Sequence, residues 1–232
     1  MEKVATTGGE KELKTQDQIE YKIHHWGPLL FKTKVSLQDV KKLKKICYAA
    51  TQNWGKNLAG IIKDEKLIDK KKYTDIVRPY FRAYQDAYKI WYGLHLKGVD
   101  VNAAWVNFMK KGEANPPHIH HDCHLSSVLF IDIPKPITKE QKNWKGTGSG
   151  PAALNFFTGN PQNFHTNSFD FIPEVGDFFV FPWNLTHSVA PFRSDVTRIT
   201  IAANFKIIDD NIFEKTDDGS VKKKKATKHL SK

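Results

Sequence analysis

His118-Ile119-His120-His121-Asp122 stands near the middle of the 232-residue chain. A second histidine motif, His187-Ser188-Val189-Ala190-Pro191, follows far downstream, and Arg198 comes eleven residues after His187. Imidazole and carboxylate groups suit a divalent iron, and two histidines with one carboxylate leave three positions open for other molecules. The order and spacing of these residues predict a metal site with a basic residue one strand later, placed to hold an acidic partner.

The first metal ligand can be chosen in two ways. Side chains alternate between faces along an extended chain, so His118, His120 and Asp122 share one face. Three alternate positions span roughly 13 Å, and adjacent alternates chelate one ion more easily than the outer pair. The pair is therefore His120 with Asp122, or His118 with His120. We choose His120, Asp122 and His187 as the ligands because a carboxylate lowers the net charge of the site, and keep His118 as the alternate.

Hydrophobic periodicity predicts helices first and strands afterwards. A first strand is expected within 21–35, and helices are expected at about 36–51 and 75–96. Short strand-like runs separated by turn residues follow, and 134–150, rich in Lys and Gly, is expected to be a surface loop. The expected strands are 103–110, 125–133, 152–158, 169–173, 177–181, 188–192 and 198–207. Many short strands after helices indicate an α+β fold, a barrel or sandwich backed by N-terminal helices.

Composition places the chain among globular proteins. Its hydrophobic content is 40%, and no apolar run approaches the roughly 18 residues of a membrane helix, so we expect one soluble domain and no membrane partner. The polar N-terminus lacks a secretory signal, and two cysteines suit a reducing compartment, which predicts a cytoplasmic protein. We expect disorder in 1–20, one domain over 21–213 with helical support at about 36–96 and a β core at about 100–207, and a basic tail over 214–232.

The formal net charge of +11 is concentrated unevenly. The tail 214–232 holds seven lysines against three acidic residues. A lysine run lends sequence-independent affinity for polyanions, but solvated basic ends are common. We therefore favour a solvated tail over a nucleic-acid partner.

The motifs resemble those of iron- and 2-oxoglutarate-dependent oxygenases. His120-His121-Asp122 fits the HxD element, His187 fits the distal histidine, and Arg198 with Thr200 fits the RxT/S element. Longer runs resemble a group of 2-oxoglutarate oxygenases of marine bacteria and their phages: Asn115-Pro116-Pro117-His118-Ile119-His120, Leu125-Ser126-Ser127-Val128, Gly176-Asp177-Phe178-Phe179-Val180-Phe181-Pro182 and His187-Ser188-Val189-Ala190-Pro191-Phe192. The resemblance covers roughly 100–207. It implies a double-stranded β-helix, the jelly-roll or cupin-like barrel, in a protein of a bacterium or its phage.

The resemblance also implies roles for individual residues. Fe(II) would be the metal, with 2-oxoglutarate and O2 as co-substrates. Arg198 would hold the distal carboxylate of 2-oxoglutarate, helped by the Thr200 hydroxyl. Asn107 and Ser127, on the strands before and after the first ligands, are further expected co-substrate contacts. Weaker candidates for the walls of the site are Leu129, Asn155 and Trp183.

The activity expected from the resemblance is hydroxylation of an unidentified organic or peptide substrate. Three substrate classes compete: a protein or peptide side chain, a free metabolite and a nucleic-acid base. Oxygenases that dealkylate bases carry a second arginine six positions after the first, and Asn204 stands there, which weakens the third class. A peptide side chain is slightly favoured because long loops beside an open barrel can admit a peptide. Two alternatives remain: a non-catalytic cupin-like binding barrel, and an all-histidine iron dioxygenase that does not use 2-oxoglutarate.

Overall fold

A computed structural model of the chain describes residues 10–14, 20–24, 27–55, 58, 60–159, 167–208, 211–215 and 221–225. The chain divides into two compact units. The larger unit comprises 28–81 and 101–206, and the smaller comprises 1–27, 82–100 and 207–232. All the predicted site residues lie in the larger unit.

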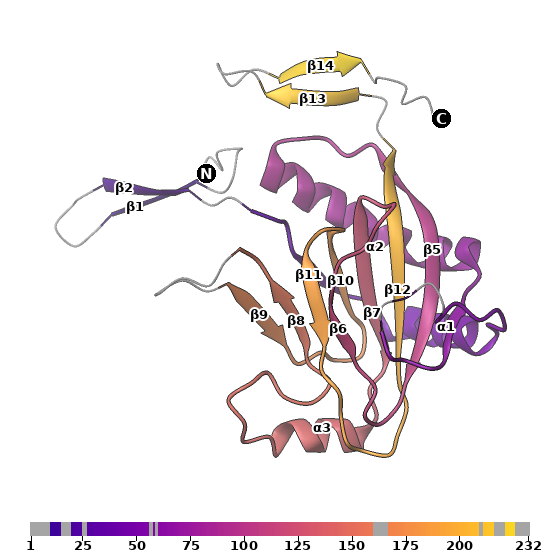
Figure 1. Cartoon of the computed structure of the whole chain (residues 1–232). Coiled ribbons are helices and arrows are strands. Elements are labelled where there is room, and N and C mark those ends of the chain that lie inside the picture. The colour runs from indigo at the N-terminus through magenta and orange to yellow at the C-terminus, as the bar shows by residue number, and fades with distance from the viewer. Residues whose placement is uncertain are drawn as a thin grey trace. The chain divides into compact units, whose positions relative to one another are not determined.

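Two antiparallel sheets form the larger unit (Figure 1). The first is six-stranded, and its order is β3 (Phe31–Lys34), β10 (Asp177–Pro182), β7 (Leu125–Asp132), β12 (Arg198–Ile208), β5 (Gly98–Met109) and β4 (Glu65–Leu67). The second is four-stranded, in the order β6 (Asn115–His118), β11 (Thr186–Val189), β8 (Leu154–Phe157) and β9 (Ser168–Phe171). Strands distant in sequence are neighbours in both sheets, as the predicted double-stranded β-helix requires.

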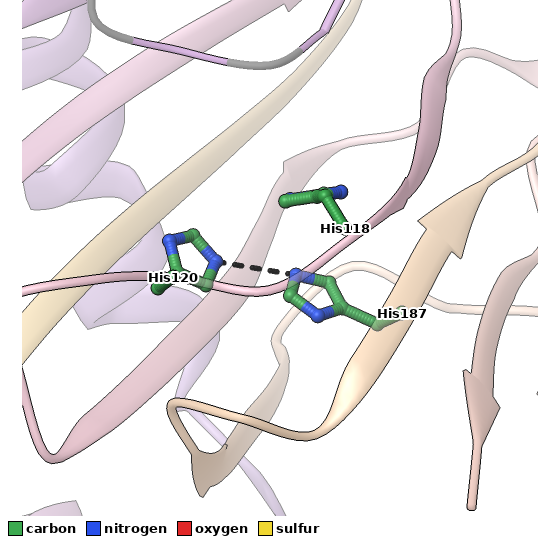
Figure 2. Close-up of side chains that lie close together, drawn as sticks. All are labelled: His118, His120 and His187. Atoms are coloured by element: carbon green, nitrogen blue, oxygen red, sulfur yellow. Dashed lines mark hydrogen bonds between the residues drawn. The ribbon is translucent and has the colours of Figure 1, made fainter.

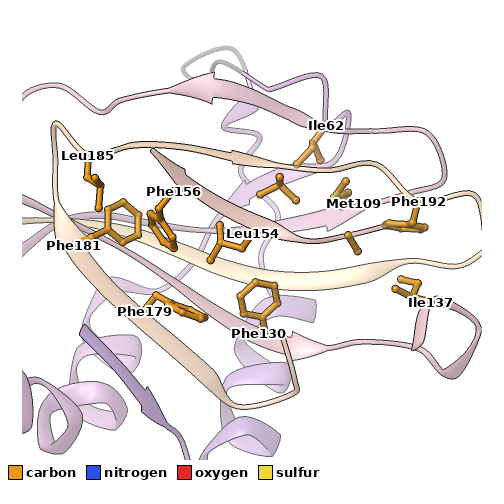
Figure 3. Close-up of a cluster of buried hydrophobic side chains, with 12 residues drawn as sticks. Ile62, Met109, Phe130, Ile137, Leu154, Phe156, Phe179, Phe181, Leu185 and Phe192 are labelled. Atoms are coloured by element: carbon orange, nitrogen blue, oxygen red, sulfur yellow. The ribbon is translucent and has the colours of Figure 1, made fainter. Parts of the chain in front are cut away.

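Aromatic side chains fill the space between the two sheets (Figure 3). Phe156 of β8 lies 6.0 Å from Phe179 and 5.0 Å from Phe181 of β10, measured between ring centroids. Phe130 of β7 lies 6.2 Å from Phe179. These rings are at most 2% exposed, and burying each of them contributes about 1.5–3 kcal/mol to folding. The core therefore fixes the separation of the two sheets that carry the candidate site.

The opposite face of the six-stranded sheet is covered by helices. Phe178 and Phe205 contact Phe81 of α2 (Lys70–Tyr92), at centroid distances of 5.9 and 4.4 Å. An ion pair between Lys44 and Asp132 joins α1 (Leu37–Tyr48) to β7. Both faces of β10 are thus buried, which explains why its sequence is continuously apolar after its first residue instead of alternating.

A tight turn sets the start of β10. Gly176 has a φ of +89°, and its backbone N–H donates to the Phe130 carbonyl while its own carbonyl accepts from Val35. A Cβ at this position would lie 2.7 Å from the Val35 carbonyl oxygen. Only glycine fits both the left-handed conformation and the close approach of β3.

The smaller unit contains two hairpins of described backbone. β1 (Glu10–Lys14) pairs with β2 (Glu20–His24), and β13 (Asn211–Lys215) pairs with β14 (Val221–Lys225). Strand β1 falls inside the segment expected to be disordered, and β14 falls inside the expected basic tail. The remainder of those two segments lies mostly outside the described residues. The predicted domain limits therefore stay predictions.

Two local expectations were wrong. The segment expected to be a surface loop contains α3 (Lys135–Lys142), because Ile137 is fully buried against the core and proline follows the helix start. The strand expected over 21–35 is interrupted between β2 and β3. None of the helices in the described part of the chain is long and apolar enough to cross a bilayer.

Replacing Ser36 by alanine tests the start of α1. The Ser36 hydroxyl accepts a hydrogen bond from the Asp39 backbone N–H at 3.1 Å, which satisfies a helix-terminal donor. We expect the variant to lose about 1 kcal/mol of unfolding free energy in urea titration. Metal binding should be unaltered, and an unchanged stability would contradict the assigned cap.

Candidate active site

Three histidines converge where β6 pairs with β11 (Figure 2). His118 ends β6 and is the direct cross-strand partner of His187 in β11. His120 lies two residues past β6, and its backbone N–H donates to the Trp183 carbonyl at 2.9 Å. Each histidine offers a ring nitrogen, and these nitrogens lie within 4.8 Å of one another. Within the described part of the chain, these three side chains form the one group suited to hold a metal ion.

Backbone carbonyls orient two of these rings. The Nδ1 atom of His118 lies 2.7 Å from the Pro116 carbonyl oxygen, and that of His187 lies 2.9 Å from the Leu185 carbonyl oxygen. A carbonyl can only accept, so each Nδ1 carries the proton and each Nε2 presents a lone pair. Metal-binding histidines are commonly held by such a hydrogen bond from the second ring nitrogen.

The spacing of the nitrogens fits a shared ion. Nε2 of His120 and Nε2 of His187 are 3.2 Å apart. Ligand nitrogens at right angles, each about 2.0–2.1 Å from a first-row divalent ion, are about 3 Å apart. The pair therefore already has the separation that two neighbouring ligands need.

Burial keeps the histidine rings neutral. The pKa of His120 is lowered to about 3 and that of His187 to about 4. Desolvation is the largest cause of both shifts, and charge repulsion from neighbouring histidines contributes to each. Desolvation also lowers the pKa of His118. The unprotonated ring is the form that binds a metal, so the site is in its ligand form near neutral pH.

Asp122 does not belong to the grouped side chains. Its backbone is left-handed, with a φ of +57°, its side chain is exposed, and its carbonyl accepts from Asn102 Nδ2 at 2.7 Å. The alternation that placed Asp122 beside His120 assumed a regular strand, whereas β6 ends at His118. The structure thus groups His120 and His187 with the alternate ligand His118, and not with the carboxylate preferred from sequence.

Arg198 is a buried cation that pairs with no acidic side chain among the described residues. It is 2% exposed, and its guanidinium donates to the Ala152 carbonyl and to Met109 Sδ, both at 3.0 Å. The guanidinium carbon lies 5.5 Å from the Phe130 ring centroid. Nε is enclosed and has no hydrogen-bond partner, and desolvation lowers the pKa of the side chain to about 10. A buried charge is stable only when paired, so this position calls for an anion.

The other predicted co-substrate contacts divide into two groups. Asn107 Nδ2 donates to Thr200 Oγ1 at 3.1 Å, both side chains are buried, and both line the same cavity as Arg198. Ser127 borders that cavity, but its strand register matches Val180 and Ala203, and its hydroxyl donates to the Ala203 carbonyl. The Ser127 side chain therefore shares the helix-covered face, because residues opposite one another in a sheet point the same way.

The weaker candidates occupy different positions. Leu129 shares the helix-covered face with Ile201, its register partner. Asn155 donates to Ser188 Oγ at 3.2 Å, and its buried Oδ1 has no partner. Trp183 contributes the carbonyl that holds His120 in place.

A cavity of about 590 Å³ joins these groups. Its walls come from both sheets and from the segment before β4, and they include the three histidines, Arg198, Asn107 and Thr200. Glu65 of β4 also lines it, although sequence reasoning did not select this residue. Glu65 lies in a three-residue strand without an evident period, so only the register of β4 against β5 could have revealed it.

Comparison with known proteins agrees with this geometry. Residues 103–204 match the model of a family described as "Putative 2OG-Fe(II) oxygenase". Residues 103–204 are thus similar to the 2OG-Fe(II) oxygenase family. This segment runs from β5 to β12 and contains the three histidines, Arg198 and Thr200. No curated protein sequence matches the chain.

Solved structures of other proteins share the fold. A prolyl-4-hydroxylase from Pseudomonas putida is 14% identical, with a TM-score of 0.50 over 78% of this chain and 93% of that one. HygX from Streptomyces hygroscopicus, with nickel and 2-oxoglutarate bound, is 9% identical, with a TM-score of 0.51 over 77% of this chain and 82% of that one. HygX has also been solved with hygromycin B. The jelly-roll double-stranded β-helix predicted from sequence is confirmed.

The family match over residues 103–204 supports the predicted enzyme class. The 2OG-Fe(II) oxygenases are oxidoreductases that use Fe(II), 2-oxoglutarate and O2, and the three-histidine group supplies nitrogen ligands suited to the iron. A non-catalytic barrel is therefore not the interpretation that these findings support.

Glutamine at position 65 should make stability less dependent on pH. Desolvation, with the nearby Glu113 charge, raises the pKa of Glu65 from 4.5 to about 7. The folded state therefore binds this proton more tightly than the unfolded state, and wild-type stability falls as pH rises from about 4.5 through 7, by about 3 kcal/mol. We expect Glu65→Gln to gain stability over wild type at pH 8 but not at pH 4.5, measured by urea unfolding. Equal differences at the two pH values would contradict the raised pKa.

Proposed function

We propose that the chain is an Fe(II)- and 2-oxoglutarate-dependent dioxygenase that hydroxylates a protein or peptide side chain. One observation carries the co-substrate assignment: the histidine group and a buried, unpaired arginine line the same cavity. A dianion that chelates a metal at one end and carries a carboxylate at the other would bind the metal held by the histidines and also pair with the arginine. When bound, Fe(II) with 2-oxoglutarate and O2 supplies the oxidising power to convert a substrate C–H into C–OH, yielding succinate and CO2.

We assign the metal to His118, His120 and His187. Backbone carbonyls hold the Nδ1 protons of His118 and His187, which leaves their Nε2 lone pairs for a metal, and burial keeps all three rings neutral. Three neutral nitrogen ligands leave the iron charge uncompensated, which favours the binding of an anionic co-substrate beside it.

We assign the distal carboxylate of 2-oxoglutarate to Arg198. The unsatisfied Nε and the planar guanidinium offer parallel donors to a carboxylate, and the surrounding apolar wall strengthens each charge-assisted bond. Thr200 Oγ1 accepts from Asn107, so its own hydroxyl hydrogen can be donated to the same carboxylate. Asn107 therefore acts on the co-substrate through Thr200, as a positioning residue.

Arg198 argues against the alternative of an all-histidine iron dioxygenase that does not use 2-oxoglutarate. An all-histidine site was associated with an enzyme that does not use 2-oxoglutarate, in which Arg198 would have no role. A fully buried arginine without an acid would then carry an unexplained cost of several kcal/mol. We therefore combine the three histidines with 2-oxoglutarate use.

The peptide preference rests on the surface beside the cavity. The fold is shared both with a prolyl-4-hydroxylase and with HygX, which binds hygromycin B, so likeness of fold favours neither class. What favours a peptide is the second hollow, about 830 Å³, that adjoins the cavity through Trp54, Asn102 and Ala103. An extended substrate could lie there while one side chain enters the cavity.

Alanine substitutions test the ligand assignment. Anaerobic addition of Fe(II) and then 2-oxoglutarate to wild-type protein should produce the weak visible charge-transfer band of the chelate. We expect His118→Ala to abolish the band and Asp122→Ala to retain it, because only His118 shares the donor group. The reverse pattern would restore the carboxylate as the ligand.

Methionine at position 198 tests the co-substrate assignment. Arg198→Met keeps an unbranched side chain but removes the charge, and we expect about 100-fold weaker 2-oxoglutarate binding, since two charge-assisted hydrogen bonds are lost. Without ligand, the variant should unfold at the same temperature as wild type or higher, because an unpaired buried charge is removed.

A matched control is Arg193→Met, which makes the same change at an exposed arginine outside the cavity and should bind 2-oxoglutarate normally. If Arg198→Met were strongly destabilised while still binding 2-oxoglutarate, the arginine would have only a structural role.

A further inference from the structure

Glu65 is a buried carboxylate in the cavity wall, and no described residue forms a hydrogen bond with its Oε2 atom. It is 1% exposed, Oε2 is fully enclosed, and that oxygen accepts no hydrogen bond. No ion pair to Glu65 is found among the described residues. Gly55 packs over the carboxyl group, where a Cβ would begin 3.5 Å from Oε2. Such a group is costly to fold, and in a cavity wall it is a candidate for ligand recognition.

The direction of the side chain follows from the sheet. Glu65 of β4 is the direct antiparallel partner of Asn107 of β5, so both side chains project from the same face. Asn107 reaches Thr200 across the cavity wall, which identifies that face as the inner one. Glu65 therefore points inward beside Asn107.

Glu65 and Asn107 each have a buried side-chain oxygen that lacks a hydrogen-bond donor among the described residues. Asn107 Oδ1 is also buried and without a partner. Two hydrogen-bond acceptors on adjoining strands, with Cβ atoms about 5 Å apart, lack donors from the described protein. A ligand that offers several N–H donors would satisfy both.

The charged side chains close to Glu65 in sequence or space do not pair with its carboxyl group. Lys66 pairs with Asp64 at 3.1 Å, on the other side of the strand. The two Glu113 oxygens accept from the backbone N–H groups of Lys63 and Lys110, so that acid is satisfied by itself. Glu65 remains the one acid in the cavity wall that is buried without such compensation in the described part of the chain.

The co-substrate is a poor partner for this acid. In the sheet, β5 separates β4 from β12, so Glu65 lies about 10 Å from the strand that carries Arg198. An anion held by Arg198 would be repelled by Glu65, whereas a cation would be attracted. Trp54 and Trp105 line the same cavity, and aromatic rings add further attraction for cations.

We propose that Glu65, with the side-chain amide oxygen Oδ1 of Asn107 beside it, recognises a positively charged nitrogen of the substrate, an amine or a guanidine. This inference rests on the proposed function, because it names the substrate class of the same site. The cation enters on the β4 side, while the anionic co-substrate occupies the β12 side. Two sources carry this chemistry, a lysine or arginine side chain of a peptide and a free amine or guanidine.

The test compares charged and neutral probes of equal size. Calorimetric titrations would use acetyl-Gly-X-Gly-amide peptides in which X is lysine, norleucine, arginine or citrulline. The free compounds would be butylamine with butanol, and butylguanidine with butylurea. Each titration would be run on the metal-free protein and on the anaerobic Fe(II) and 2-oxoglutarate complex. We expect the charged member of a pair to bind wild type about tenfold or more tightly than the neutral one. Whether peptides or free compounds bind better identifies the source.

Variants then assign the preference to Glu65. Glu65→Gln keeps the shape and should reduce the preference to less than about twofold, while the Fe(II) and 2-oxoglutarate band persists. Asp64→Asn makes the same change in charge one residue away, outside the cavity, and should keep the preference. The wild-type comparison needs no variant and stands even if Glu65→Gln folds poorly.

The outcomes separate this inference from the proposed function. A visible band without any preference for the cation, with no probe binding, or with tighter binding of the neutral probes overturns the cation assignment and leaves the oxygenase assignment intact. Preference for the cation without a band supports the role of Glu65 but contradicts the proposed use of 2-oxoglutarate. A preference retained in Glu65→Gln also overturns the inference.

Discussion

The pairing of β6 with β11 is the interaction on which the site depends. It makes His118 and His187 direct neighbours across two strands that are far apart in sequence. The chain that continues from β6 then places His120 beside both of them. The aromatic core between the sheets holds β11 and β8 at a fixed distance from β10 and β7. Without that core, no local preference of either histidine segment would bring their nitrogens within bonding distance of one ion.

Polarity in the cavity is arranged by position in the sheets. Neutral histidines lie in or directly after strands of the four-stranded sheet. Among the described residues, Arg198 on β12 has no acidic partner and Glu65 on β4 has no basic one. Arg198 and Glu65 are each destabilising in a dry interior, yet they stand two strands apart and do not neutralise one another. Unmet charges of opposite sign on separate walls are expected where a site accepts an anion on one side and a cation on the other.

Much of the site could be predicted because its residue types are rare and ordered. The spacing of the histidine run, His187 and Arg198 was enough to select residues that line one cavity, and Asn107 and Thr200 followed from their strands. Ser127 and Asp122 were less predictable, for a geometric reason. A strand register decides which face Ser127 takes, and the left-handed backbone at Asp122 ends the alternation that sequence reasoning assumed.

The sequence by itself determined the fold class, the enzyme class and a set of candidate site residues, because motifs and hydrophobic periods are properties of the local chain. Tertiary structure alone decided that the ring nitrogens of His118, His120 and His187 lie together, that α3 forms within an expected loop, and that Glu65 enters the cavity wall. Those outcomes depend on register and burial between segments distant in sequence, and neither quantity is encoded in the spacing of residues along one strand.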